Sequence, residues 1–316
     1  AMRMIDAGNA SVDQFHGSWA GAFGNMQFMP TTFVTYAVDG DGDKQIDIVN
    51  SAADAFASAA NYLAQVGWRK ADPAMIEVQL PENFQWQNAQ LNVRESTEEW
   101  AGLGVNALSF KNNEDEAKLV QTSASLKPSK SKLNKKKAIH KTKAADKKTY
   151  TKKATTKKTI GYLHYQNSTS NDLIHNPLTY GDLTVTSELP NTTRQAAILL
   201  PQGWRGPAFM VFENFDAIMD WNRSVNYALS VAQLANRIEG GPRVIGGQFA
   251  ESGALTFHEM FALQAELNNR GFDTGEPDGF PGLQTQAAIR AYQLSQGLPA
   301  DGYASPSLYT RLHETK

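Results

Sequence analysis

The sequence has no cysteine in its 316 residues. A chain without thiols forms no disulfide framework, no iron–sulfur cluster and no zinc site with thiolate ligands, and it offers no cysteine nucleophile. The absence is compatible with an oxidising compartment but does not require one. Cysteine usage therefore excludes several kinds of site without assigning the protein to a compartment.

Long apolar runs are also missing. No run approaches the roughly 20 apolar residues that a membrane-spanning helix needs. The chain begins Ala1-Met-Arg-Met4, without the basic-then-apolar pattern of a secretory signal. Sequence typical of a folded domain follows almost immediately. We expect either that the natural start has been removed or that the sequence is a fragment.

Arginine is absent from the most highly charged part of the chain. Between Lys127 and Lys158 there are 14 Lys, no Arg and one acid, Asp146, which gives a local balance of +13. The rest of the chain has 16 basic and 31 acidic residues, a balance of −15. The formal net charge of −2 therefore conceals an acidic protein that carries a basic stretch.

Large apolar residues nearly vanish around the same stretch, where Lys, Thr, Ser and Ala dominate. Such a composition cannot bury enough surface to offset its chain entropy, so we predict a disordered, self-repelling insertion over 112–186. Two alternatives stay open. The lysines would bind the phosphates of nucleic acid in a salt-sensitive way, or would contact an anionic wall or membrane surface weakly. Without Arg or interleaved aromatic residues, no specific nucleic acid is expected.

The remaining sequence is typical of a mainly α protein. Ser51 to Gly67 predicts an Ala-rich helix that Ser51 or Asn50 caps, with an apolar face formed by Phe56, Ala59, Ala60 and Leu63. Ser96-Thr-Glu-Glu99 is a capping box that begins a short helix. Apolar residues spaced as on one helical face predict a further helix from Tyr227 to Ile238.

Gly17-Ser-Trp-Ala-Gly-Ala-Phe-Gly-Asn-Met-Gln-Phe-Met-Pro30 is the first motif. Composition alone favours a close-packed helical hairpin, because the small residues let backbones approach. The block nevertheless resembles the G-S-[FW]-A-G-A-x-G-x-x-Q-F-M-P pattern of the membrane-bound lytic murein transglycosylases of the B type. The resemblance continues in later segments: Tyr36-Ala-Val-Asp39, the acidic loop, Asn61-Tyr-Leu63, Gly206-Pro-Ala-Phe209, Asn214-Phe215, and Trp221-Asn-Arg-Ser224 with Tyr227-Ala228.

The resemblance implies an enzyme that cleaves the β-1,4 bond between N-acetylmuramic acid and N-acetylglucosamine in peptidoglycan and forms a 1,6-anhydro product. The sugar's own hydroxyl attacks, so a single Glu serves first as acid and then as base, and it needs a raised pKa in an apolar cleft. The family pattern places Ser18, Gln27, Trp221 and Asn222 along the substrate groove.

The family's catalytic Glu lies several tens of residues before this block, yet the first Glu in the sequence is Glu77. We therefore expect an N-terminally truncated member that lacks the catalytic acid, binds glycan poorly and cleaves none.

Asp39-Gly-Asp-Gly-Asp-Lys-Gln-Ile-Asp47 is the second motif. Carboxylates at positions 1, 3 and 5 and a carbonyl at position 7 are how a calcium loop surrounds its ion, and three close carboxylates repel without a cation. The alternative is a solvated turn, since Lys44 stands where a regular loop has Gly and Asn50 where it has Glu. Family members carry a calcium site here that takes its last carboxylate from further on. The predicted structural Ca²⁺ ligands are Asp39, Asp41, Asp43, the carbonyl of Gln45, and Asp54.

The segment 253–316 is the third motif and looks like a separate domain. Two Asp-Gly turns, Asp278-Gly279 and Asp301-Gly302, each precede a helix. With Leu263-Gln264 and Ala291-Tyr-Gln293, they resemble the small three-helix peptidoglycan-binding domain, and a generic helical mini-domain would hardly share both turns. Such modules hold an enzyme on the insoluble wall and raise the effective substrate concentration.

The combined prediction is a lysozyme-like transglycosylase domain, incomplete at its N-terminus, followed by a three-helix peptidoglycan-binding domain. Peptidoglycan is the expected partner and the periplasm or cell envelope the expected location. A non-catalytic wall-binding or scaffold protein stays open as the alternative. The predicted boundaries are 1–111 and 187–245 for the two parts of the transglycosylase domain, 112–186 for the insertion between them, and 253–316 for the C-terminal domain.

Overall fold

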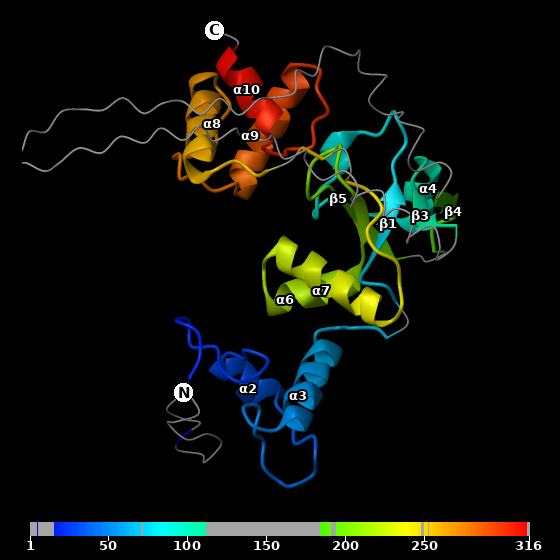
Figure 1. The fold of residues 1–316 in the computed structure, drawn as a ribbon, viewed down its shortest axis with the longest axis vertical. Coiled ribbons are helices and arrows are strands. Elements are labelled where there is room, and N and C mark those ends of the chain that lie inside the picture. The colour runs from blue at the N-terminus through cyan, green and yellow to red at the C-terminus, as the bar shows by residue number, and fades with distance from the viewer. Residues whose placement is uncertain are drawn as a thin grey trace, which may run out of the picture. The chain divides into compact units, whose positions relative to one another are not determined.

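The computed structural model describes residues 5, 16–70, 72–111, 184–190, 194–247, 250–251 and 253–314. Residues 112–183 of the predicted insertion lie outside these ranges, so their predicted disorder stays a prediction. Residues 184–186 belong to a paired strand, so the predicted end of the insertion at residue 186 was wrong. No helix in the described ranges is both long and apolar enough to cross a membrane. The helices (Figure 1) are α2 (Pro30–Tyr36), α3 (Ala52–Gln65), α4 (Thr97–Gly102), α6 (Glu213–Trp221), α7 (Val225–Ile238), α8 (Phe257–Asn269), α9 (Leu283–Ser295) and α10 (Pro306–Glu314), with a 3-10 turn at Trp86–Asn88.

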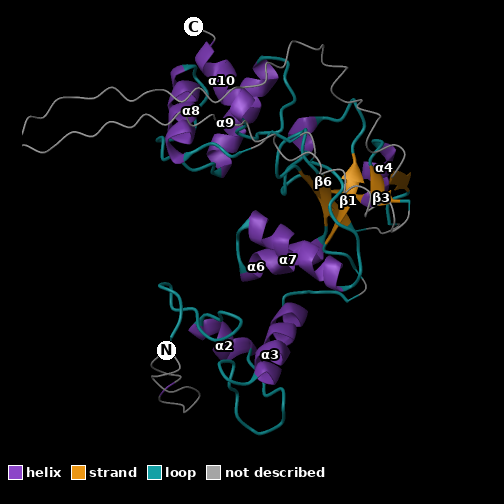
Figure 2. Ribbon diagram, in the orientation of Figure 1, coloured by secondary structure: helices purple, strands orange, loops and turns teal. Residues whose placement is uncertain are grey.

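A six-stranded antiparallel sheet lies beside these helices and was not predicted from the sequence (Figure 2). Its order is β2-β5-β6-β1-β3-β4. The strands are β1 (Met75–Gln79), β2 (Glu95–Ser96), β3 (Asn106–Phe110), β4 (Thr184–Ser187), β5 (Gln195–Leu199) and β6 (Ala208–Val211). They are short and carry Ala, Ser and Gln beside apolar residues, so they lack the clean alternation that identifies a strand.

The sheet joins the sequence on the two sides of the Lys-rich stretch. β1, β2 and β3 precede that stretch, and each pairs with a strand that follows it: β6, β5 and β4 respectively. Phe110 at the end of β3 is paired with Thr184 at the start of β4. The chain therefore leaves the sheet at Phe110 and returns to it at Thr184 in the neighbouring strand.

Each face of the sheet buries a separate core. On one face Trp100 of α4 is fully buried, and its indole N–H donates to the carbonyl oxygen of Ala196 at 2.8 Å. On the other face Phe215 and Ile218 of α6, with Ala228 and Ala232 of α7, cover β5 and β6. All four residues of β6 are buried, which is why this strand reads as an uninterrupted apolar run.

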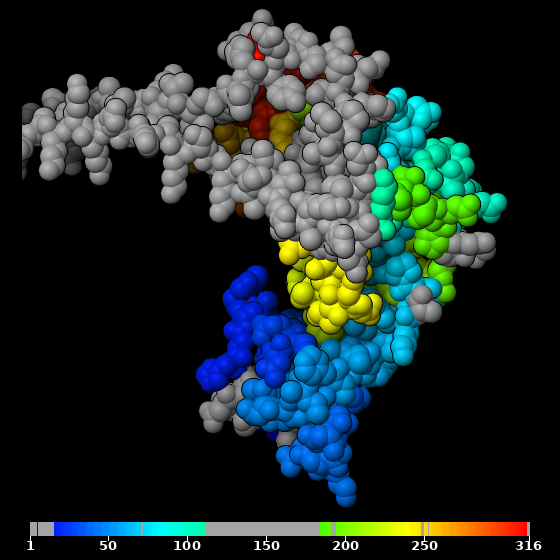
Figure 3. All heavy atoms as spheres, turned by 45° about the vertical axis from the view of Figure 1, so that its right-hand side comes forward, coloured from blue at the N-terminus to red at the C-terminus, as the bar shows by residue number. Residues whose placement is uncertain are grey.

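Buried Asn214 in the first turn of α6 fixes the segment that leads into β1. Its side-chain oxygen accepts from the backbone N–H of Arg69, and its amide donates to the carbonyls of Arg69 and Asp72, all at 2.8 Å. Trp68 and Met75 of the same region pack against the α6–α7 side of the sheet. The end of α7, yellow in the space-filling view, lies against the pale blue atoms of this earlier segment (Figure 3).

Helix α3 confirms one sequence prediction and corrects another. Ser51 caps it, because its hydroxyl oxygen accepts from the backbone N–H of Asp54. The predicted apolar face was right at Leu63, which packs against the core beside α2, and wrong at Phe56, which is 66% exposed; the buried face is formed by Asp54, Ala55, Ser58 and Tyr62. The inner face is partly polar because Asp54 and Ser58 form hydrogen bonds to the preceding loop, while Tyr62 packs in an aromatic cluster.

Helices α8, α9 and α10 form the predicted three-helix C-terminal domain with a core of its own. Leu263, Ile289 and Leu312 are fully buried at its centre. Thr256 and Glu259 form a capping box at the start of α8. The domain's hydrophobic cluster is separate from those of the sheet, as expected for an independent packing unit.

Replacing Asn214 with Ala should lower the free energy of unfolding by on the order of 3 kcal/mol, because three hydrogen bonds from this buried side chain to the backbone of Arg69 and Asp72 are lost. Asn226→Ala on the exposed side of α7 is the matched control and should change stability by less than about 0.5 kcal/mol. Urea unfolding followed by circular dichroism measures both. Equal stability of the two variants would contradict the role given to Asn214.

Candidate functional site

The first motif forms a tight loop before α2 and not a helical hairpin. The backbone N–H of Ser18 donates to the carbonyl of Ala22 at 2.8 Å, and Phe23 and Phe28 exchange both backbone hydrogen bonds at 2.9 Å. A Cβ at Gly17 would lie 1.9 Å from the carbonyl oxygen of Ala22. Only glycine fits there, so the spacing of small residues reflects turn geometry.

Gln27 stands in the left-handed region of backbone conformation, with φ of 52°. This backbone conformation is unfavourable for a residue with a side chain. It persists only where the surrounding structure imposes it, which is often the case at functional sites. The Gln27 amide donates to the carbonyl of Gly24 at 3.0 Å. Gly24 itself has φ of 73° and fits against Ile48, where a Cβ would lie 2.8 Å from the side chain.

The loop brings an aromatic cluster together with the end of α6. The ring of Trp221 lies 5.1 Å from Phe28 and 4.8 Å from Tyr62, and Tyr62 lies 4.8 Å from Tyr36. Burial raises the pKa of Tyr62, with Asp220 and Tyr36 adding to the effect, so the phenol stays neutral and able to donate. Two sequence blocks from opposite sides of the Lys-rich stretch therefore meet at one place.

The four residues predicted to contact substrate lie at or beside this cluster. Trp221 is half-buried within it, and Asn222 follows directly and is exposed. Gln27 precedes Phe28 and is exposed, and Ser18 is exposed at the start of the same loop. Rings with neighbouring amide and hydroxyl groups suit a sugar, whose ring face stacks on aromatics while its hydroxyl and N-acetyl groups form hydrogen bonds. The roles of the four residues stay predictions.

Sequence reasoning missed Phe28 and Tyr62 as partners of Trp221. Both lie in segments that carry the family pattern, Phe28 beside Gln27 and Tyr62 after Asn61. Their place within the family pattern was the sequence signal that could have identified them. Trp19, fully exposed on the same loop, was also not singled out.

The acidic loop gathers three carboxylates. One oxygen from each of Asp39, Asp41 and Asp54 lies within 4.8 Å of the other two. The carboxylate of Asp43 instead accepts the backbone N–H of Gln45 at 2.7 Å. Oxygen donors of this kind suit a hard cation such as Ca²⁺.

Asp54 links the loop to α3. It is 1% exposed, and its two oxygens accept the backbone N–H groups of Gly40 and Asp47, each at 2.7 Å. Backbone N–H groups of Gly42 and Lys44 hold the pKa of Asp39 below its ordinary value, so this carboxyl group is ionised at neutral pH. The three carboxylates therefore lie close together, and Asp54 connects their loop to α3.

Glu77, the first glutamate of the chain, is not placed as an acid catalyst. Burial raises the pKa of its carboxyl, against the effect of two backbone hydrogen bonds. Its oxygens accept the N–H groups of Ile245 and Gly246 at 2.7 and 2.6 Å. Glu77 therefore fastens the segment after α7 to β1.

Comparison with known families and proteins gives consistent matches. A family model described as "Transglycosylase SLT domain" matches residues 1–146 and 140–236, and a model of a peptidoglycan binding domain matches 259–312. SltB3 from Pseudomonas aeruginosa in complex with NAG-anhNAM-pentapeptide has a similar fold, with a TM-score of 0.70 and 34% identity over 99% of this chain and 64% of that chain.

Two curated relatives match shorter segments. Membrane-bound lytic murein transglycosylase B of Escherichia coli (strain K12) is 45% identical over 60 residues, 19% of this chain and 16% of that protein. N-acetylmuramoyl-L-alanine amidase CwlM of Mycobacterium tuberculosis is 40% identical over 73 residues, 23% of this chain and 18% of that protein. The chain thus spans less than two thirds of each relative.

Proposed function

The chain belongs to the family of proteins with a transglycosylase SLT domain, and from this premise we propose that it acts in lytic cleavage of peptidoglycan. The observation that carries the proposal is the ring contact between Phe28, which follows Gln27, and Trp221, which precedes Asn222: two distant sequence blocks meet in one aromatic cluster, with exposed amide side chains next to it in the sequence. The C-terminal domain, which matches a peptidoglycan binding model, would hold the protein on the same polymer.

The reaction proposed is a transglycosylation at the β-1,4 bond between N-acetylmuramic acid and N-acetylglucosamine. A glutamic acid gives its proton to the glycosidic oxygen as the bond to C1 breaks. The resulting carboxylate then takes the proton of the 6-hydroxyl as that oxygen attacks C1, which leaves a 1,6-anhydro ring. Ser18, Gln27, Trp221 and Asn222 would bind and orient the glycan, and the proposed location is the periplasm or cell envelope.

Glu77 does not supply the acid in this proposal. No Glu precedes Glu77, and the carboxylate of Glu77 is occupied by two backbone N–H groups. The alternative, a non-catalytic wall-binding or scaffold protein, uses the same surfaces and differs only in whether bonds are cleaved.

The chain should release no anhydro-muropeptides from purified peptidoglycan sacculi, because Glu77 is held by two backbone N–H groups and no other Glu of the chain is assigned as the proton donor. Mass spectrometry of the soluble fraction after overnight incubation measures this. An unrelated active lytic transglycosylase provides the positive control. Clear release above a heat-killed sample would show that a carboxylate within these residues is catalytic.

The chain should co-sediment with insoluble sacculi, and a variant lacking residues 253–316 should lose most of this binding, because avidity of two attached binding surfaces is lost. Measuring bound protein in 0.15 M and 0.5 M salt separates specific binding from attraction by the Lys-rich stretch, which salt screens. Retention unchanged by the deletion would refute the targeting role of the C-terminal domain.

We further propose that the acidic loop holds a structural Ca²⁺ through Asp39, Asp41, Asp43, the Gln45 carbonyl and Asp54. The support is the approach of three carboxylates, one of them buried, which repel one another until a cation neutralises them. Bound Ca²⁺ would fix the loop between α2 and α3, and so the position of Tyr62 relative to Trp221.

Ca²⁺ at about 100 times its dissociation constant should stabilise the fold by ~2.7 kcal/mol and raise the melting temperature. Asp41→Ala with Asp43→Ala should remove this increment. Glu98→Ala with Glu276→Ala removes the same charge from exposed positions outside the loop and should leave the increment intact. A melting temperature that does not respond to Ca²⁺ would rule out the site.

A further inference from the structure

The two Asp-Gly turns of the C-terminal domain share one hydrogen-bond arrangement. In the first, the Gln264 amide donates to Asp278 Oδ1 at 2.9 Å, and its oxygen accepts the N–H of Gly279 at 2.8 Å. Asp278 Oδ1 also accepts the N–H of Phe280 at 2.9 Å. Gly279 has φ of 75°, as the turn demands.

The second turn repeats these contacts. The Gln293 amide donates to Asp301 Oδ1 at 2.7 Å, its oxygen accepts the N–H of Gly302 at 2.9 Å, and Asp301 Oδ1 accepts the N–H of Tyr303 at 2.9 Å. Gly302 has φ of 73°. In both turns Oδ1 closes the turn, and the second oxygen, Oδ2, is left for a partner.

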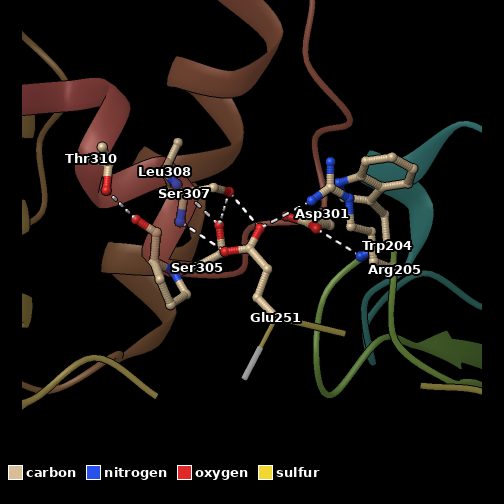
Figure 4. A network of polar contacts seen from close by, with 9 residues as sticks. Trp204, Arg205, Glu251, Asp301, Ser305, Ser307, Leu308 and Thr310 are labelled. Atoms are coloured by element: carbon tan, nitrogen blue, oxygen red, sulfur yellow. Dashed lines mark hydrogen bonds and ion pairs between the residues drawn. The ribbon is translucent and has the colours of Figure 1, made fainter. Parts of the chain in front are cut away.

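In the second turn that partner is a backbone amide from the loop between β5 and β6. The N–H of Trp204 donates to Asp301 Oδ2 at 2.8 Å, and a Cβ at Gly203 would lie 2.8 Å from the same oxygen (Figure 4). Glu251 closes the contact beside it: its carboxylate pairs with Arg205 at 3.4 Å and accepts from the N–H of Ser307 at 2.8 Å.

In the first turn the equivalent oxygen faces solvent. Asp278 is exposed, and within the described part of the chain Oδ2 has no recorded hydrogen bond. The hydrogen bond from Gln264, followed by that from the Phe280 N–H, lowers the pKa of Asp278, so the group is a carboxylate at neutral pH. Asp278 Oδ2 is thus a charged hydrogen-bond acceptor in the position where Asp301 Oδ2 binds a backbone amide.

Exposed aromatic rings lie beside this turn. Phe280 is 63% exposed and Phe257 is 51% exposed, and their rings meet edge to face at 5.7 Å. A Cβ at Gly279 would lie 2.5 Å from the Phe257 ring, so the turn and the ring are packed closely. Leu283, 85% exposed, extends the apolar surface.

We propose that the Asp278 turn is the glycan-contact site of the C-terminal domain: Asp278 Oδ2 accepts the amide N–H of an N-acetylated sugar whose ring face lies on Phe280. The proposal rests on the proposed function and adds to it the contact residues and the sugar class. The Trp204 amide on the equivalent turn shows how such a carboxylate captures an N–H, and the Asp301 turn is thereby assigned to docking within the protein.

Charge favours an uncharged N-acetyl sugar over the acidic peptide stem. From Asp273 to Ile289 the sequence has three acids, Asp273, Glu276 and Asp278, and no Lys or Arg. A stem carboxylate placed on this surface would be repelled. A flat aromatic face beside an amide acceptor matches a sugar that carries an N-acetyl group.

The test is a titration of the ¹⁵N-labelled full chain with chitotetraose, an uncharged oligomer of N-acetylglucosamine, followed by backbone amide shifts. Shifts of Gly279 and Phe280 should saturate, and Asp278→Asn should weaken this binding about tenfold, because a charged acceptor is replaced by an NH₂ donor. Asn keeps Oδ1, so the turn itself is retained. Asp301→Asn is the same change in the docked turn and should leave the titration at Gly279 within about twofold.

Phe280→Ala gives a second variant should Asp278→Asn unfold, and it should also weaken binding about tenfold. A titration of Asp278→Asn identical to that of the original chain would overturn the site while leaving the proposed function intact. Sacculus binding without any shift at Gly279 or Phe280 on adding chitotetraose would overturn the assignment to sugar. Failure of the chain to bind sacculi at all would instead refute the proposed function.

Discussion

Antiparallel pairing between strands on opposite sides of the Lys-rich stretch is the constraint on which the sheet, its two cores and the candidate site depend. β1, β2 and β3 bind β6, β5 and β4, and buried Asn214 adds three hydrogen bonds to the segment before β1. These contacts close one folding unit around a long sequence separation, whose entropic cost grows only slowly with length. An insertion at the β3–β4 junction therefore leaves the paired strands undisturbed.

The candidate site follows from that pairing. β6 leads directly into α6, whose last residue, Trp221, meets the ring of Phe28 from the first motif. Tyr62 contacts the same indole from α3, and the acidic loop before α3 is tied to that helix by buried Asp54. The aromatic cluster and the three carboxylates are thus both attached to α3, so the cation proposed for the loop would also fix the position of the rings.

The sequence predicted the family, the three-helix domain, the Ser51 cap and the Ser96 capping box, because motif spacing and capping are local chemistry. It did not predict the sheet, since strands such as Gln195–Leu199 are short and buried on both faces. It also misplaced the buried face of α3, where Phe56 points outward and Asp54 inward. A polar side chain is buried where it meets hydrogen-bond partners that are distant in the sequence. The periodicity of apolar residues carries no information about those partners.

The central claim, that one domain is assembled across the Lys-rich stretch, is tested most directly by excising residues 112–183 and joining Lys111 to Thr184 through an Asn-Gly turn. The measurement is the thermal unfolding midpoint by circular dichroism. Because Phe110 and Thr184 are paired in the sheet, the account predicts a cooperative transition within a few degrees of that of the full chain. An unfolded product, or a midpoint lowered by tens of degrees, would contradict it.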